Sequence, residues 1–350
     1  MDSITHIAIG ACIGEAVLGK KIGKKAMLIG AIAQSVPDID FISALWMSPA
    51  GNLLAHRGIT HSFLFAILCA LLLGFACKKL YGSYPVSIKI WLLFFGGQIF
   101  IHIFLDAFNV YGIGWFEPFS HYRVSFNTIF VADPFFSLWP GIALIVLLAL
   151  KKNNNKRSWW VKFGIGLSSL YLFYCVINKS KMDNQVKNAF TYQHIIYKRY
   201  FTTPTAMNNW LWYIVVENDS GYLIGYRSLF DEREQVDFSY FPRKDILLDT
   251  ISDHIDLQQL IRFSNGYYTT EQWHDTLVFN DIRFGQMNGW MNPYAHFAFH
   301  YYLQHTGDNR LIVQRGRFGQ WNLETVKFLF QRIKGRKIPV KDDEFRLMLK

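Results

Sequence analysis

Residues 37–62 read PDIDFISALWMSPAGNLLAHRGITHS, a stretch that concentrates ionisable side chains inside an apolar half of the chain. It holds two carboxylates directly after a proline and two histidines around an arginine: Asp38, Asp40, His56, Arg57 and His61. Near the centre of a bilayer, an ionisable side chain costs at least ~2.5 kcal/mol on insertion scales. Such residues therefore require a compensating charge, and a divalent metal ion is the natural candidate.

The 350-residue chain divides into two parts of different polarity. It is 51% apolar and 18% charged, which is more apolar than an ordinary soluble enzyme. Residues 1–177 carry only 7 of the 26 acidic and 14 of the 36 basic residues. We therefore predict an α-helical membrane domain of four to six helices over residues 1–181, followed by a small, water-exposed α+β domain over residues 182–350.

Six apolar runs define the candidate membrane helices, at residues 4–19, 26–48, 62–77, 90–111, 135–150 and 159–177. Several are short for a ~30 Å hydrocarbon core, which needs about 20 residues. Clusters of Lys and Arg separate the runs, at residues 20–25, 78–89 and 151–157. Such clusters mark cytoplasmic loops. If all six runs span, the polar residues of the site and the C-terminal domain lie on the extracytoplasmic side.

The charge, the cysteines and the N-terminal residues argue against nucleic-acid binding, cysteine-based sites and a cleaved leader. The net charge of +10 follows these loop clusters, so it predicts membrane topology and not nucleic-acid binding. The four cysteines have no CxxC spacing, so neither disulfides nor a zinc finger is expected. An acid at position 2 stands where a signal peptide carries a base, so no cleaved leader is predicted.

The C-terminal part has the texture of strands and turns. Residues 210–230, WLWYIVVENDSGYLIGYRSLF, read as a β-hairpin around an Asn-Asp-Ser-Gly turn. Residues 266–285 repeat the strand-turn-strand pattern. Between them, residues 245–264 have apolar positions spaced at three and four, which favours a helix.

The candidate site residues have spacings that suit metal binding. His102 and Asp106 are four apart, so on a helix they share one face and can bind one ion. Asp38 and Asp40 cannot share a helical face, so one is expected to bind metal or act as general base while the other supports it. Arg57 suits a phosphate or carboxylate of a substrate.

Each of these residues also has a purely structural interpretation. His6 at a helix start and Asp38 after a proline are often caps, and His102 with Asp106 could be a buried polar pair. His121 and Asp133 are secondary candidates, for which roles in a loop and a cap are favoured. The argument for a site is that one topology places all the main candidates on the same face.

In order along the chain, His6, PDIDF at 37–41, HRGITHS at 56–62, HIFLDAFNVYG at 102–112, EPFS at 117–120 and ADPFF at 132–136 resemble the YdjM-type family of inner-membrane metal-dependent hydrolases. The resemblance covers about residues 1–180, and residues 210–231 also resemble an extension found in a subgroup. It implies a multi-pass protein of the inner (cytoplasmic) membrane that hydrolyses an unknown substrate.

The motif order is more remotely similar to the zinc-dependent phospholipase C and single-strand nuclease superfamily. That similarity implies five metal ligands: His6, Asp38, His61, His102 and Asp106. Asp40 and His56 are further candidates. One or two ions are expected, Zn²⁺ first and Mn²⁺ as the alternative. Asp38 or Asp40 would act as base and Arg57 would hold developing negative charge.

The predicted function is hydrolysis of a phosphoester or lipid-derived substrate by metal-activated water, with membrane lipid or a small molecule as partner. Two alternatives remain open at this level. The same intramembrane Asp and His residues could relay ions in a transporter, or the protein could be a non-catalytic membrane scaffold.

Overall fold

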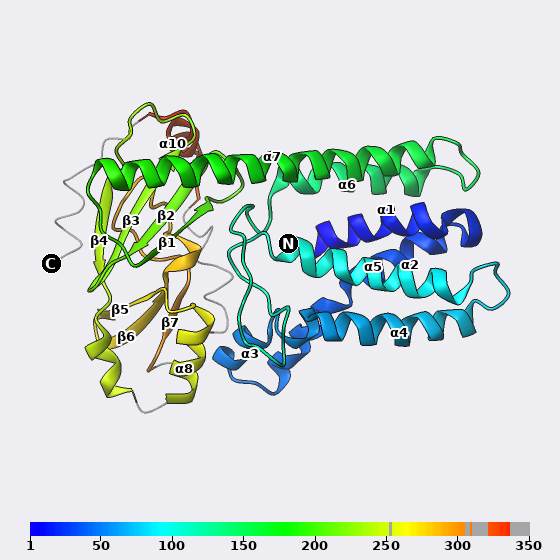
Figure 1. The fold of residues 1–350 in the computed structure, drawn as a ribbon, viewed down its shortest axis with the longest axis horizontal. Coiled ribbons are helices and arrows are strands. Elements are labelled where there is room, and N and C mark those ends of the chain that lie inside the picture. Colours follow the sequence, from blue (N-terminus) through cyan, green and yellow to red (C-terminus); the bar gives the residue numbers. More distant parts are fainter. Residues whose placement is uncertain (252–253, 305–308, 310–320, 337–350) are drawn as a thin grey trace. The chain divides into compact units, whose positions relative to one another are not determined.

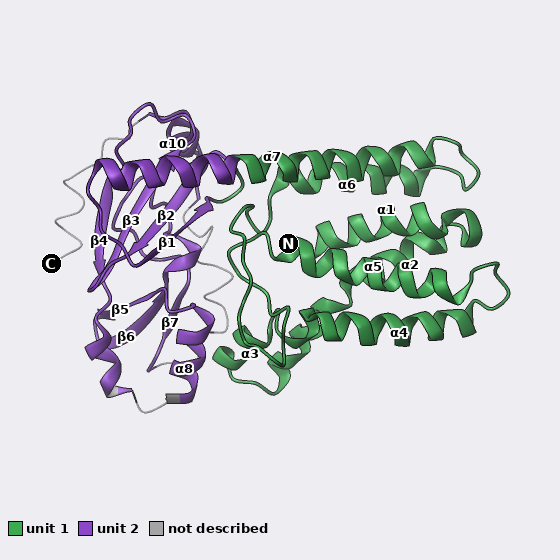
Figure 2. Cartoon of the chain, in the orientation of Figure 1, with its two compact units in different colours: residues 1–177, 206–208 green, residues 178–205, 209–350 purple. Residues whose placement is uncertain are grey.

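The computed structural model describes residues 1–251, 254–304, 309 and 321–336. By contacts, the chain divides into two compact units (Figures 1 and 2). Unit 1 comprises Met1–Ile177 with Ala206–Asn208, and unit 2 comprises Asn178–Thr205 with Asn209–Lys350.

Unit 1 is helical throughout its described elements. Its α-helices are α1 (Ser3–Ile22), α2 (Lys25–Ser35), α3 (Pro49–Ala55), α4 (Phe63–Leu80), α5 (Ile88–Asp106), α6 (Pro134–Ala149) and the first part of α7 (Arg157–Tyr192). Two short 3₁₀ helices, η1 (Pro37–Leu45) and η2 (Ile59–His61), lie within the stretch of residues 37–62.

Three described helices, α4, α5 and α7, are long and apolar enough to cross a bilayer. A fourth span arises if α2 and η1 count as one segment, bent by 56° at its break. The sequence predicted four to six membrane helices, whereas the described residues contain three to four candidate spans. The difference arises because α6 has only 16 residues and α1 includes Glu15, Lys20 and Lys21.

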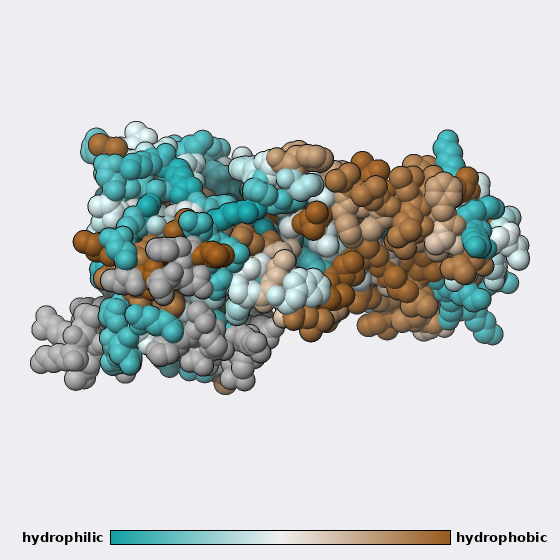
Figure 3. Space-filling model, turned by 90° about the horizontal axis from the view of Figure 1, so that it is seen from below, coloured by the Kyte–Doolittle hydropathy of each residue, from teal (hydrophilic) through white to brown (hydrophobic). Residues whose placement is uncertain are grey.

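The surface of unit 1 agrees with a membrane domain. On the face shown in Figure 3, apolar side chains cover the helical part, and hydrophilic residues gather at its far end. The α1–α2, α4–α5 and α6–α7 connections lie together at one end of the unit (Figure 1). Lys24 in the first connection donates to the Leu148 carbonyl next to the third, at 2.5 Å. The three Lys/Arg clusters are therefore located at one end.

The break between α2 and η1 occurs at Pro37. Proline lacks the N–H that would continue the helical ladder, so it ends α2 and begins a new element in another direction. In the tighter 3₁₀ turn that follows, Asp40 is buried and Ile39 and Phe41 are exposed. This change of direction is what carries the two carboxylates away from the axis of α2.

Helices α1 and α2 approach each other through glycines. A Cβ atom on Gly30 would lie 2.1 Å from the Gly10 carbonyl oxygen, and one on Gly10 would lie 2.4 Å from the Gly30 carbonyl oxygen. Small residues at such crossings allow backbones to pack closely in membrane proteins. The crossing positions Gln34, at the C-terminal end of α2, beside the site described below.

Unit 2 contains two antiparallel sheets. The first has the order β1 (Arg199–Pro204), β2 (Leu211–Glu217), β3 (Gly221–Ser228) and β4 (Phe238–Pro242), and the second has the order β5 (Tyr268–Trp273), β6 (Thr276–Asp281) and β7 (His300–Tyr302). Short helices accompany them: η3 (Asp245–Thr250), α8 (His254–Phe263), η4 (Ile282–Phe284) and α10 (Leu323–Ile333).

Both predicted hairpins are confirmed. Leu211 pairs with Ser228 and Glu217 with Tyr222, and the Asn218 side chain accepts from the backbone N–H groups of Ser220 and Gly221. In the second hairpin, Tyr268 pairs with Asp281. The later part of α7 covers one face of the first sheet (Figure 1), where Met182 and Phe190 pack with Trp212.

We expect Gly30→Val to destabilise unit 1 by at least about 1–3 kcal/mol, the usual range for overpacking, because the obstructing atom is a backbone oxygen that cannot rotate away. The matched control is Gly97→Val on α5, where an added Cβ meets no atom within 4 Å. Thermal unfolding in detergent should show a lower midpoint for Gly30→Val only. Equal midpoints for the two variants would contradict the close crossing.

Candidate metal centre

Four side chains from three elements converge in unit 1. Asp38 comes from η1, His61 from η2, and His102 and Asp106 from α5. One ligand atom from each lies within 4.8 Å of all the others. The predicted pairing of His102 and Asp106 on one helical face places both in this group.

The spacing of the ligand atoms suits a single small cation. The two Nε2 atoms of His61 and His102 are 3.2 Å apart. Asp38 Oδ1 lies 3.6 Å from the first and 3.5 Å from the second, and Asp106 Oδ2 lies 3.7 Å from each. Ligands about 2.0–2.1 Å from a tetrahedral Zn²⁺ are about 3.3 Å from one another. Small inward shifts would complete such a site.

The hydrogen bonds of the two histidines direct both Nε2 lone pairs into the group. His102 Nδ1 lies 2.5 Å from the Gln34 backbone carbonyl, which can only accept, so Nδ1 carries the proton. His61 Nδ1 lies 3.0 Å from the Thr60 hydroxyl and 3.4 Å from Asp40 Oδ2. Two imidazole Nε2 atoms and two carboxylates thus face one another, which is a ligand set that suits a divalent cation.

His61 is fully buried, and this burial lowers the pKa of its imidazole to about 4. The ring is therefore neutral at pH 7, which is the form that binds metals.

Asp106 also carries the contacts that hold the group in place. Its Oδ1 lies 3.2 Å from His6 Nε2 and contacts the Met1 α-amino group, and its Oδ2 lies 3.0 Å from Arg57 Nε. His6 stacks on His102 with ring centroids 3.8 Å apart. His6, predicted as a ligand, therefore adjoins the four-residue group but is not one of its members.

Asp40 and His56 also lie beside the group. Asp40 accepts from the Arg57 backbone N–H at 2.8 Å, lies 3.1 Å from His56 Nδ1 and accepts from the Thr60 hydroxyl at 3.4 Å. Together with the Thr60 hydroxyl, it lies at His61 Nδ1, on the side of the ring opposite the group. Carboxylates in this position beside a histidine fix its tautomer and raise its basicity as a ligand.

Arg57 is buried, and its guanidinium is occupied by the protein itself. Besides Asp106, it donates to Asn109 Oδ1 at 2.8 Å and to the Met1 carbonyl at 3.2 Å, and it lies over the Tyr111 ring at 5.0 Å. Its backbone has φ 59°, so Arg57, and not Gly58, adopts the left-handed conformation in the turn.

The two secondary candidates lie elsewhere. His121 is exposed and pairs with Glu117 at 2.9 Å. Asp133 caps α6 by accepting from the backbone N–H groups of Phe135 and Phe136, and it accepts from the Tyr171 hydroxyl at 3.0 Å. Neither belongs to the group of four.

Sequence reasoning assigned no role to three residues that support the site. Thr60 and Asn109 were within reach of prediction, because both lie inside the quoted motifs HRGITHS and HIFLDAFN. Gln34 supplies a backbone carbonyl to His102, and a backbone group leaves no signature in the residue type.

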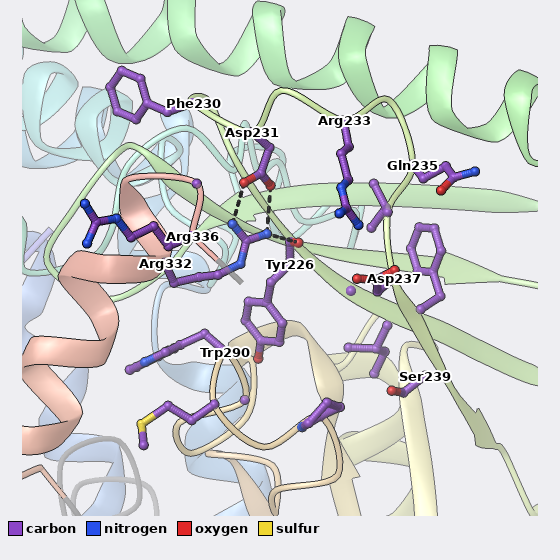
Figure 4. Close-up of a pocket in the computed structure, with 18 of the residues that line it drawn as sticks. Tyr226, Phe230, Asp231, Arg233, Gln235, Asp237, Ser239, Trp290, Arg332 and Arg336 are labelled. Carbon is purple, nitrogen blue, oxygen red and sulfur yellow. Dashed lines mark hydrogen bonds and ion pairs between the residues drawn. The ribbon is translucent and has the colours of Figure 1, made fainter. Parts of the chain in front are cut away.

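Unit 2 holds a separate cavity of about 590 Å³ (Figure 4). Asp231 and Arg332 face each other in it through contacts of 2.6 and 2.7 Å, and Arg332 also donates to the Tyr226 carbonyl at 2.9 Å. Asp231 pairs with Arg332. Arg233 and Arg336 also line the cavity. The volume lies within the range of small-molecule sites.

Helices able to cross a bilayer, arranged around a buried His/Asp group, define a membrane protein with a candidate metal centre. More particularly, the chain belongs to the YdjM inner membrane protein family, which matches residues 1–182.

Two relatives resemble parts of this region. Inner membrane protein YbcI of Escherichia coli (strain K12) is 34% identical over 122 residues, which are 34% of this chain and 69% of YbcI. The uncharacterized protein YfhP of Bacillus subtilis (strain 168) is 32% identical over 146 residues, which are 39% of this chain and 42% of YfhP. No solved structure is significantly similar to the chain.

We expect His61→Ala and His102→Ala each to remove stoichiometric metal from the purified protein, because each deletes one of four ligands. His121→Ala is the control, since this histidine is exposed and outside the group. Elemental analysis of detergent-purified protein measures the result. Full metal content in His61→Ala would contradict the assignment.

Asp40→Asn should weaken metal binding about 10–100-fold without abolishing it, because it alters the partner of His61 Nδ1 and leaves every ligand in place. Glu117→Gln makes the same chemical change outside the group and should bind as the wild type does. Competition with a chelating dye measures both affinities. An unchanged affinity for Asp40→Asn would show that this carboxylate does not support the ligand.

Proposed function

We propose that this protein is a membrane-bound, metal-dependent hydrolase that acts on a phosphoester or lipid-derived substrate. One observation carries the proposal: two imidazole Nε2 atoms and two carboxylates converge in a group that could hold a metal ion. The mixed His/Asp ligand set favours Zn²⁺, with Mn²⁺ as the alternative and one or two ions bound.

The chemistry divides among the residues already described. When bound, the ion supplies Lewis-acid activation of water and of the scissile group. Asp38 is the most exposed member of the group, and its Oδ2 accepts a 3.3 Å hydrogen bond from Ser3, so it is placed to take the proton of the attacking water. Arg57 adds a fixed positive charge through Asp106, which favours negative charge developing at the centre.

We also propose an extracytoplasmic centre. His102 and Asp106 lie near the C-terminal end of α5, whereas residues 78–89 with their lysines precede or begin that helix. The metal group and the Lys/Arg clusters are thus at opposite ends of α5, and the positive-inside rule assigns the clusters to the cytoplasm. On this topology the basic residues mark membrane loops, and membrane lipid, not nucleic acid, is the partner.

A second candidate function, ion-coupled transport, is favoured by one observation. The α2–η1 span is broken at the group, and broken helices carry the binding sites of many transporters. The sequence shows no internal repeat of the kind common in those folds. Hydrolysis and transport differ in a simple respect, because only the first consumes its substrate.

The test uses purified protein in nanodiscs made from bacterial lipid extract and supplied with Zn²⁺. We expect new cleavage products by mass spectrometry, their loss on chelation, and at least about 100-fold lower turnover when His102→Ala and Asp106→Ala are combined, since the ion would no longer be held. His121→Ala should retain wild-type turnover. Products that persist in the double variant would refute the hydrolase, and ion flux without products would favour transport.

A further inference from the structure

The four members of the group differ in exposure. His61, His102 and Asp106 are completely buried, whereas 23% of the Asp38 side chain is exposed. Among the four, Asp38 is therefore the side from which a substrate can approach, and its surroundings are called the opening. The residues around Asp38 thus indicate what kind of substrate enters.

The first wall of this opening is η1 itself. Its two carboxylates are directed toward the histidines, whereas the apolar residues between and after them are exposed: Ile39, Phe41 and Ile42. The short helix η1 therefore has its carboxylates on the side of the group and exposed apolar side chains on its outer side.

The second wall is the first turn of α1. The Ser3 hydroxyl donates to Asp38 Oδ2 at 3.3 Å, which places this turn directly at the opening. The next residue, Ile4, is 79% exposed. Apolar side chains thus border Asp38 from both elements.

The environment that accepts these side chains is a bilayer. Leu28 and Ile32 on the preceding helix α2 are also exposed, and α2 with η1 forms the bent candidate span. Contiguous exposed apolar surface marks membrane contact, and broken helices at membrane depth occur where they line a site.

We infer that the metal centre opens sideways into the bilayer, between the first turn of α1 and η1, and that its substrate is a membrane lipid. The polar head of the lipid enters past Asp38 while its hydrocarbon chain stays beside Ile4 and Ile39. This inference rests on the proposed function and adds to it the substrate class and the route of entry.

The test compares two metal-binding probes on Co²⁺-loaded protein in nanodiscs, read by the visible spectrum of the ion. Dodecyl hydroxamate resides in the bilayer, and acetohydroxamate stays in water. We expect the bilayer probe to bind preferentially. Ile39→Trp should weaken its binding about tenfold by narrowing the opening, whereas Ile32→Trp, an exposed position on α2, should not.

The outcomes separate the two proposals. If Co²⁺ does not bind, the metal centre fails, and the route fails with it. If Co²⁺ binds but acetohydroxamate is preferred, or Ile39→Trp behaves as Ile32→Trp does, the centre opens to water and the sideways route is overturned while the hydrolase proposal stands.

A second measurement needs no ligand and covers the case in which Ile39→Trp does not fold. A nitroxide is attached at Ile39→Cys in a background that lacks Cys69 and Cys77, and Leu72→Cys on the exposed face of α4 is the bilayer reference. The label at position 39 should collide with oxygen in preference to a water-soluble nickel chelate, as the reference does. The opposite preference would overturn the inference.

Discussion

The constraint on which unit 1 depends is the mutual repulsion of four electron-pair donors held within 4.8 Å of one another. The Nδ1 of His102 lies against the Gln34 carbonyl and the Nδ1 of His61 lies near the Thr60 hydroxyl and Asp40, so both Nε2 atoms face the group. In an apolar surrounding such repulsion is weakly screened. The protein reduces it with Arg57 beside Asp106, and a divalent cation would remove the rest.

The elements around the centre can be understood from that requirement. Pro37 breaks a candidate membrane span so that Asp38 joins the group of four and Asp40 faces His61. The glycine contact between α1 and α2 brings His6 and the Gln34 carbonyl close to α5. Arg123 donates to the carbonyls of Leu54, His56 and Gly112, which ties the turn that bears His56 to the segment after α5. The loops and the helix crossing thus position the residues around the His/Asp group.

Unit 2 has a different physical basis. Its sheets are stabilised by apolar packing, with β2 buried along its whole length, and its cavity has an internally neutralised ion pair. Membership of the YdjM family covers residues 1–182, so the family relationship accounts for the helical unit and ends near the start of the sheet domain. The metal centre and the cavity of unit 2 are accordingly two independent features of the chain.

The sequence alone determined those features that depend on local periodicity and composition. These are the apolar first half, the shared face of His102 and Asp106, and both hairpins, since a helical or strand repeat places neighbouring side chains without reference to distant residues. Only the tertiary structure decided that Asp38 joins the group of four while Asp40 lies beside His61, that His6 and His56 stand next to the group, and that Arg57 is occupied internally. These assignments depend on the bend at Pro37 and on contacts between residues up to a hundred positions apart. No local pattern encodes such distances, because they arise from the packing of whole elements.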